Sequence, residues 1–128
     1  MIELILIRGL PGSGKSTKAK ELALKMGAVH IETDMFWSPL HGSDSPKLSK
    51  ARAWCRRQTD NWLRRGKSVI VSNTFVQMWE MQPYLDLATK HEVPVTVLVA
   101  NGKYQNIHGA PDEKIAEMKT RWEPFQQR

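Results

Sequence analysis

The sequence has little cysteine and no long apolar run. Cys55 is the only cysteine among 128 residues, which excludes an internal disulfide framework and a cysteine-rich metal site. No stretch of about 18 apolar residues occurs, so no segment has the composition of a membrane-spanning helix. The segment from Met1 to Ile7 lacks the basic start of a secretory signal. We therefore expect a cytoplasmic protein with one domain over residues 1–128, a length near the commonest domain size.

Acidic residues are few relative to basic ones, and the basic excess is local. The chain has 19 Lys and Arg against 13 Asp and Glu, which gives a net charge of +6. Eight of the basic residues lie in the segment from Lys47 to Lys67, where Asp60 is the only acid. Such a segment fits a polyanionic partner such as nucleic acid. The alternative is a helix face that is simply solvated.

The most informative stretch is the glycine-rich segment 9–17, with the sequence GLPGSGKST. It matches G-x-x-x-x-G-K-[ST], the P-loop that binds nucleotide phosphates. An apolar run of strand length precedes it at 2–7, and a helical pattern follows, which is the context that the motif requires. The residues predicted to bind the nucleotide are Gly9, Pro11, Gly12, Ser13, Gly14, Lys15, Ser16 and Thr17.

Each residue type in this loop has a physical role. The glycines let successive backbone N–H groups turn toward an anion, and the start of the next helix adds a partial positive charge. Lys15 has the length to reach the β- and γ-phosphates, and the Ser16 hydroxyl is a typical Mg²⁺ ligand. The loop alone thus predicts binding of a nucleoside triphosphate and Mg²⁺.

Strands and helices alternate along the rest of the chain. Apolar runs predict strands at 28–31, 68–71 and 94–99, whereas helical patterns cover about 48–65, a segment ending near His91, and 112–122. Thr74 and Gln77 have the spacing of a capping box for the second of these helices. The alternation predicts a parallel sheet with right-handed crossovers, and the ligand is expected at the carboxyl ends of the strands.

The first of these helices has a predicted inner face. Its apolar and neutral residues recur at helical spacing, so they are expected to face the core: Ala51, Trp54, Cys55, Gln58, Trp62 and Leu63.

In this order the motifs resemble a family, the P-loop kinases related to phage polynucleotide 5′-kinase, including small phage-type relatives. The resemblance rests on the P-loop, Asp34 after the second strand, VIVSNT at 69–74 followed by Trp79-Glu80, HGAP at 108–111, and RWE at 121–123. It implies an α/β fold, the P-loop three-layer sandwich, with a parallel sheet of about four strands in the order 2-3-1-4 and helices on both faces. It also implies transfer of the γ-phosphate of ATP to a hydroxyl.

The resemblance implies roles for individual residues. Asp34 matches the family's general base, and Lys15 is the second predicted catalytic residue, in contact with the phosphates. Alternatively, Asp34 caps a short helix or holds a water molecule bound to Mg²⁺. Asn73 matches a position near the acceptor, or else it forms a turn. Independently of the resemblance, Trp37 is a candidate to stack on a base of the acceptor, with core packing as the alternative, and Arg52 and Arg56 of the basic segment are predicted acceptor contacts. Arg121 is expected to contact ATP, and Lys103 and His108 are candidates in a lid over about 101–112.

Three positions depart from the family pattern. Trp37 and Gln105 stand where arginines are common, and Ser72 stands where an acid would contact Mg²⁺. We therefore expect Mg²⁺ to rest on Ser16, the ATP phosphates and water, with Asp34 as a further candidate. The expected acceptor is nucleic acid, at a 5′-hydroxyl end or a hydroxymethylated pyrimidine of DNA, held by a loop and basic helix over about 38–66. A kinase for a small molecule and a non-catalytic nucleotide-binding module are the alternatives.

Overall fold

The computed structural model describes residues 2–37, 48–101 and 112–125. Within these ranges the elements follow one another as β1 Leu4–Arg8, α1 Lys15–Met26, β2 Val29–Ile31, the 3-10 helix η1 Thr33–Trp37, α2 Leu48–Arg64, β3 Val69–Asn73, α3 Met78–Lys90, β4 Val95–Val99 and α4 Asp112–Arg121. The strands and helices predicted from the sequence are all present, with ends that differ by a few residues.

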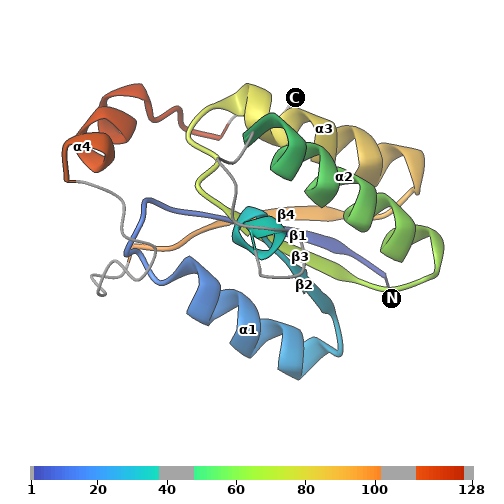
Figure 1. The fold of residues 1–128 in the computed structure, drawn as a ribbon. Helices are drawn as coiled ribbons and strands as arrows, with labels where there is room; N and C mark the ends of the chain where they lie inside the picture. Colours follow the sequence, from blue (N-terminus) through green and yellow to red (C-terminus); the bar gives the residue numbers. More distant parts are fainter. Residues whose placement is uncertain (1, 38–47, 102–111, 126–128) are drawn as a thin grey trace.

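The sheet has four parallel strands in the order β2-β3-β1-β4. In the register of the sheet, Leu4 of β1 lies opposite Val69 of β3 and Val95 of β4. Figure 1 shows α1 on one face, α2 and α3 on the other, and α4 beyond the carboxyl ends of the strands. The predicted three-layer sandwich and strand order are confirmed.

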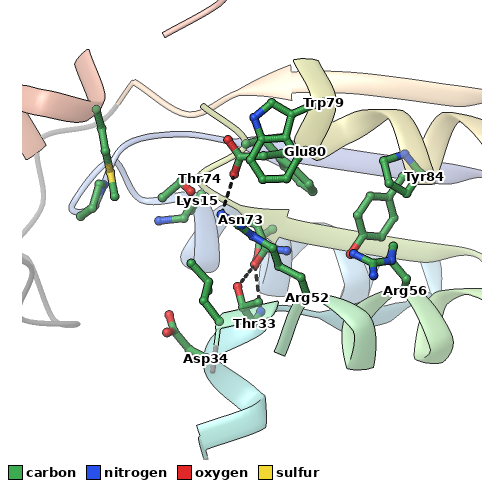
Figure 2. A pocket seen from close by; sticks show the side chains of 16 residues that line it. Lys15, Thr33, Asp34, Arg52, Arg56, Asn73, Thr74, Trp79, Glu80 and Tyr84 are labelled. Atoms are coloured by element: carbon green, nitrogen blue, oxygen red, sulfur yellow. Dashed lines mark hydrogen bonds and ion pairs between the residues drawn. The ribbon is translucent and has the colours of Figure 1, made fainter. Parts of the chain in front are cut away.

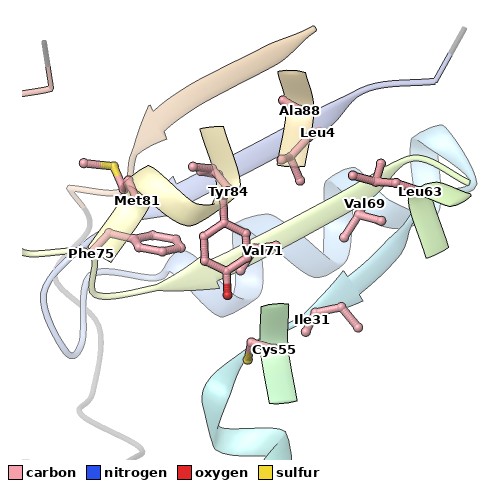
Figure 3. Packing of buried hydrophobic residues seen from close by; sticks show 11 residues of the cluster. Leu4, Ile31, Cys55, Leu63, Val69, Val71, Phe75, Met81, Tyr84 and Ala88 are labelled. Atoms are coloured by element: carbon pink, nitrogen blue, oxygen red, sulfur yellow. The ribbon is translucent and has the colours of Figure 1, made fainter. Parts of the chain in front are cut away.

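Alternation along the strands sends side chains into two separate cores. On one face, Leu4 and Leu6 of β1 and Val69 and Val71 of β3 pack beneath α2 and α3 (Figure 3). On the other face, Ile5, Ile7 and Ile70 pack against Ala19 and Ala23 of α1. The central strands β1 and β3 are therefore apolar on both faces, as parallel strands covered by helices must be.

Helix α2 buries one row of residues at four-residue spacing: Ala51, Cys55, Thr59 and Leu63. Thr59 occupies the row in place of the predicted Gln58, because its hydroxyl donates to the carbonyl oxygen of Cys55 at 2.8 Å and so stays hydrogen-bonded inside the helix. Trp54 and Trp62 pack on the same core at its edge. Burial raises the pKa of the Cys55 thiol to about 12, so this cysteine is unreactive near neutral pH.

The start of α3 corrects one prediction from the sequence. The capping box is formed by Gln77 and Glu80, so Gln77 is the N-cap and Thr74 is not. Thr74 lies in the turn after β3, where its carbonyl oxygen accepts the Gly9 N–H at 3.3 Å. The turn passes through Phe75, which has a left-handed φ of 46°. Thr74 is therefore not continuous with the helical conformation of α3. The pair Gln77 and Glu80 has the same three-residue spacing as the predicted box and competes with it in the sequence.

The end of β1 is tied to the C-terminal segment by Arg8, which is 1% exposed. Its guanidinium donates to the carbonyl oxygens of Phe75, Val76 and Glu123 and lies 3.9 Å from the ring centre of Trp122. Burial lowers the pKa of Arg8, while Glu80 and Glu123 oppose that effect. This contact fixes the chain after α4 beside the strand that leads into the P-loop.

Candidate active site at the carboxyl end of the sheet

The P-loop joins β1 to α1 and needs its glycines for steric reasons. Gly12 and Gly14 have φ values of 81° and 87°, and Gly14 is the N-cap of α1. A Cβ on Gly9 would lie 2.2 Å from the Ser13 hydroxyl oxygen. That hydroxyl is buried and has no hydrogen-bond partner among the described residues. The loop therefore has the tight geometry that the motif predicts, and a side chain at any of these three glycines would be strained.

Lys15 is the first residue of α1 and is 7% exposed. Burial lowers the pKa of its ammonium group, and the carboxylates of Asp34 and Glu32 act in the opposite direction. Ser16 follows it and is also buried. A buried cation at the start of a helix, next to an inward hydroxyl, is the arrangement expected for binding a phosphate chain and its metal ion.

Glu32 is a site residue that the sequence did not reveal. It follows β2, is 8% exposed, and its Oε2 accepts hydrogen bonds from the hydroxyls of Ser16 at 2.7 Å and Ser72 at 3.0 Å. His30 Nε2 lies 2.6 Å from the Ser72 hydroxyl oxygen, and burial lowers the pKa of His30. The available signal was an acid placed directly after a strand, at the sheet edge where the P-loop was expected.

Asp34 lies in η1 and is exposed. The turn that carries it is fixed by Asn73 at the end of β3, whose Oδ1 accepts the backbone N–H of Thr33 at 2.8 Å and also its hydroxyl. Asn73 thus joins two segments that are 40 residues apart in the chain. Its side-chain oxygen is occupied by this contact, so its structural role is to position the segment that bears Asp34.

One pocket of about 600 Å³ opens beside Lys15 and Asp34 (Figure 2). Its walls come from the P-loop, η1, α2, the end of β3, α3 and Met118 of α4. The charged and aromatic residues in its lining are Lys15, Asp34, Arg52, Arg56, Phe75, Trp79, Glu80 and Tyr84. Five of the residues predicted as catalytic or acceptor contacts are therefore in one pocket: Lys15, Asp34, Arg52, Arg56 and Asn73.

Arg52 and Trp79 form a pair at this pocket. The guanidinium lies 4.8 Å from the ring centre of Trp79 and 3.4 Å from Oε1 of Glu80. Trp79 is 56% exposed, and its indole N–H donates to the side-chain oxygen of Gln77. Figure 2 shows Arg56 farther along α2, next to the hydroxyl end of Tyr84. The sequence marked Trp79 only as part of the family resemblance.

A second pocket of about 620 Å³ lies against the outer side of the P-loop. It is lined by Gly9 to Ser13, the end of β4 with Asn101, and Ile115, Lys119 and Trp122 near the C-terminus. The predicted ATP contact Arg121 does not line either of these two pockets; it is exposed and pairs with Glu117 of α4 at 3.4 Å. From this C-terminal segment, Ile115, Lys119 and Trp122 line the second pocket.

Three further predicted contacts are not placed. Lys103 and His108 lie outside the described residues, and so does the side chain of Trp37, whose backbone ends η1. Among the helices that the structure describes, none combines the length and the apolar character needed to cross a membrane.

Comparison with curated proteins identifies related sequences. The human NEDD4-binding protein 2 is 32% identical over 135 residues, which cover 95% of this chain and 8% of that protein. The bifunctional polynucleotide phosphatase/kinase of Schizosaccharomyces pombe is 25% identical over 93 residues, covering 73% of this chain and 20% of that protein. The chain thus spans a fifth or less of the length of these curated relatives.

Solved structures share the fold. A chain in the Pnkp1/Rnl/Hen1 RNA repair complex superposes with a TM-score of 0.66 at 21% identity, over 91% of this chain and 36% of that chain. A gluconokinase from Sinorhizobium meliloti has a TM-score of 0.65 at 17% identity, over 95% of this chain and 75% of that chain. At these identities the likeness establishes a common fold and no common substrate.

A family model described as an AAA domain matches residues 4–103, most of the described core. Together with the P-loop geometry, the strand order and the relatives above, this match confirms the resemblance seen in the sequence. The chain belongs to this AAA-domain family and is a polynucleotide-kinase-like member of the P-loop kinases.

Proposed function

We propose that this domain is an ATP-dependent kinase that transfers the γ-phosphate to a hydroxyl group of a nucleic acid. The observation that carries the proposal is that the P-loop lysine, Asp34, two arginines and an exposed tryptophan all line the same pocket. Phosphoryl transfer needs a base near the acceptor hydroxyl and positive charge near the phosphates. Asp34 and Lys15 supply these, and both line the same space.

The cofactors of this reaction are ATP and Mg²⁺. When bound, Mg²⁺ neutralises charge on the phosphates. The hydroxyl of Ser16 and the carboxylate of Glu32 are hard oxygen donors of the kind that Mg²⁺ prefers, and they lie 2.7 Å apart. The described residues contain no group of three His, Cys, Asp or Glu side chains that could hold a metal.

The acceptor side of the pocket favours a nucleic acid. Arg52 and Arg56 come from successive turns of α2 and can pair with backbone phosphates, whereas the exposed indole of Trp79 can stack on a base. The polynucleotide phosphatase/kinase among the relatives supports the same class of acceptor. The hydroxyl is either a 5′ end or a hydroxymethylated pyrimidine of DNA.

A kinase for a small molecule is the second candidate. A pocket of about 600 Å³ also has the size of a metabolite site, and the gluconokinase shares the fold. In either case we propose a cytoplasmic location.

Labelled ATP separates these candidates. The protein is incubated with γ-labelled ATP, Mg²⁺ and a panel of 5′-hydroxyl oligonucleotides, hydroxymethyluracil-containing DNA, nucleosides and nucleotides. Label on DNA or RNA is the expected result. Label found on the small molecules alone would establish the second candidate. ATP binding without label on any acceptor would identify a non-catalytic nucleotide-binding module.

A further inference from the structure

The hydrogen bonds that Glu32 accepts do not by themselves require a carboxylate. Its Oε2 accepts hydrogen bonds from Ser16 of the P-loop and Ser72 of β3, so it lies where three segments meet. Two hydroxyl donors are equally satisfied by a neutral carboxamide oxygen. A buried charge is costly unless a cation balances it. His30 Nε2 lies 3.7 Å from Oε2 of Glu32, but burial lowers the pKa of His30 and so disfavours its charged form. The presence of an acid at 8% exposure therefore indicates a further cationic partner.

Lys15 supplies part of that positive charge, but Asp34 acts on Lys15 as well. Two carboxylates thus lie near one lysine, and ATP would add further negative charge to the same place. The geometry of Ser16 is the second observation. A hydroxyl that gives its hydrogen to Glu32 keeps its oxygen lone pairs available, which is what a metal ligand needs.

We infer that Glu32 is the acidic residue of this domain's Mg²⁺ site. It follows β2, and it takes the role that an acid at the end of β3 would have, because β3 ends without an acid. The inference rests on the proposed function, since the metal ion arrives with ATP. Ser72 holds the end of β3 and binds Glu32 through its hydroxyl at 3.0 Å. A carboxylate from the neighbouring strand therefore reaches the space that an acid at position 72 would occupy. Glu32 is a positioning residue that orients Ser16 and metal-bound water.

The test measures metal-dependent nucleotide binding and does not require turnover. The affinity of a fluorescent ATP analogue is titrated with Mg²⁺ and with EDTA, for the wild type and for Glu32→Gln. Partners of metal ligands typically change metal affinity by about 10–100-fold. Mg²⁺ should increase the affinity of the wild type for the analogue, and we expect Glu32→Gln to lose roughly 10–100-fold of this increase. In EDTA the variant should bind the analogue at least as tightly as the wild type does. Manganese titrations followed by electron paramagnetic resonance, with a non-hydrolysable ATP analogue, report the metal directly.

A double variant provides a second test in case Glu32→Gln does not fold. Glu32→Ser combined with Ser72→Asp moves the carboxylate from β2 to β3 and keeps one acid and one hydroxyl at this junction. We expect it to recover most of the Mg²⁺ enhancement, which a merely structural role for Glu32 would not predict. Glu21→Gln, which removes an exposed acid of α1, is the matched control.

The outcomes separate the inference from the proposed function. A folded Glu32→Gln variant with the wild-type Mg²⁺ enhancement overturns the role of Glu32 and leaves the kinase proposal intact. A wild type that binds no nucleotide with or without Mg²⁺ overturns both. If Glu32→Gln unfolds, the double variant decides: recovered enhancement supports the inference, and a folded double variant without it overturns the inference.

Discussion

Basic residues lie at both ends of the sheet, but they have different surroundings at the two ends. At the amino end, Asp60 of α2 is surrounded by Arg64 at 3.1 Å, Lys90 at 3.2 Å and His91 at 2.6 Å. At the carboxyl end, Arg52 and Arg56 line a pocket that also contains Lys15. Helix α2 therefore carries basic residues toward both ends, but at the amino end the carboxylate of Asp60 pairs with Arg64 of α2 and with Lys90 and His91 at the end of α3.

An arginine–tryptophan pair occurs at each end as well. Arg65 lies 5.5 Å from the ring centre of Trp62, which packs against the core. Arg52 lies 4.8 Å from the ring centre of Trp79, which is exposed at the pocket. Arg52 and Arg56 in the first half of the basic segment line the pocket of the proposed acceptor, whereas Arg64 and Arg65 in the second half contact Asp60 and Trp62. We therefore expect the two halves to contribute unequally to binding of a polyanion.

The largest expected effect comes from Asp34 at the carboxyl end. Asp34→Asn removes the proposed base, so kcat for phosphoryl transfer should fall by roughly 10²–10⁴-fold while ATP affinity changes little. Steady-state kinetics and an ATP titration measure the two quantities. Asp86→Asn, at an exposed position of α3, is the control. Full turnover by Asp34→Asn would show that the base assignment is wrong.

The two halves of α2 can be compared directly. Replacing Arg52 and Arg56 with alanine should raise KM for an oligonucleotide and reduce the slope of log affinity against log salt by about 1.4, since each phosphate contact on a single strand contributes roughly 0.7. The matched pair Arg64→Ala and Arg65→Ala should leave the slope near the wild-type value. Equal slopes for the two double variants would remove the distinction between the halves.

Trp79 and Trp62 allow the two ends of the sheet to be compared through one residue at each end. Trp79→Ala should weaken oligonucleotide binding by about 1–3 kcal/mol if a base stacks on the indole, and Trp79→Phe should keep most of the affinity. Trp62→Phe at the other end should alter thermal stability without altering oligonucleotide affinity, because Trp62 packs on the core. Binding is measured by fluorescence anisotropy. An alanine variant that binds as the wild type does would exclude stacking on Trp79.

The smallest effect is expected at the amino end. Hydrogen bonding to His91 is the main cause that lowers the pKa of Asp60. Because the folded pKa lies below the unfolded value of about 3.9, the ionised carboxylate stabilises the fold above about pH 4, and this contribution is lost as the pH falls through the folded pKa. Asp60→Asn should therefore reduce the free energy of unfolding by up to about 1 kcal/mol at pH 7.

Urea titrations at pH 7 and pH 3 measure this loss. The difference between Asp60→Asn and the wild type should shrink at pH 3. A difference that is the same at both pH values would indicate packing rather than charge.

The sequence predicted the fold well because the signals for it are local. The P-loop fixed the first strand and helix, and the apolar runs ending at Ile31, Val71 and Val99 placed the other strands. Local signals failed where two residues competed for one role. Gln77 caps α3 instead of Thr74, and Thr59 replaces Gln58 inside α2, because each outcome depends on a hydrogen bond that the apolar pattern does not encode.

The site was only partly predictable, because its remaining residues depend on contacts between distant segments. Glu32 belongs to it through Ser16 and Ser72, and Asn73 holds the Asp34 segment through Thr33. Arg52 and Arg56 were predicted as acceptor contacts, and both line the pocket, but the sequence did not show that Trp79, Glu80 and Tyr84 of α3 would line it with them. Arg52 also has Glu80 as a partner, so part of the charge that looked uncompensated in the sequence is balanced.

One measurement tests the central claim, that the carboxyl-end pocket transfers phosphate to a nucleic acid. The acceptor is a single-stranded oligonucleotide that carries both a 5′-hydroxyl end and one hydroxymethyluracil, and kcat/KM is compared with that for its constituent nucleosides at low and high salt. We predict a much larger kcat/KM for the oligonucleotide, which falls as salt increases. Equal values for oligonucleotide and nucleosides, with no dependence on salt, would contradict the account.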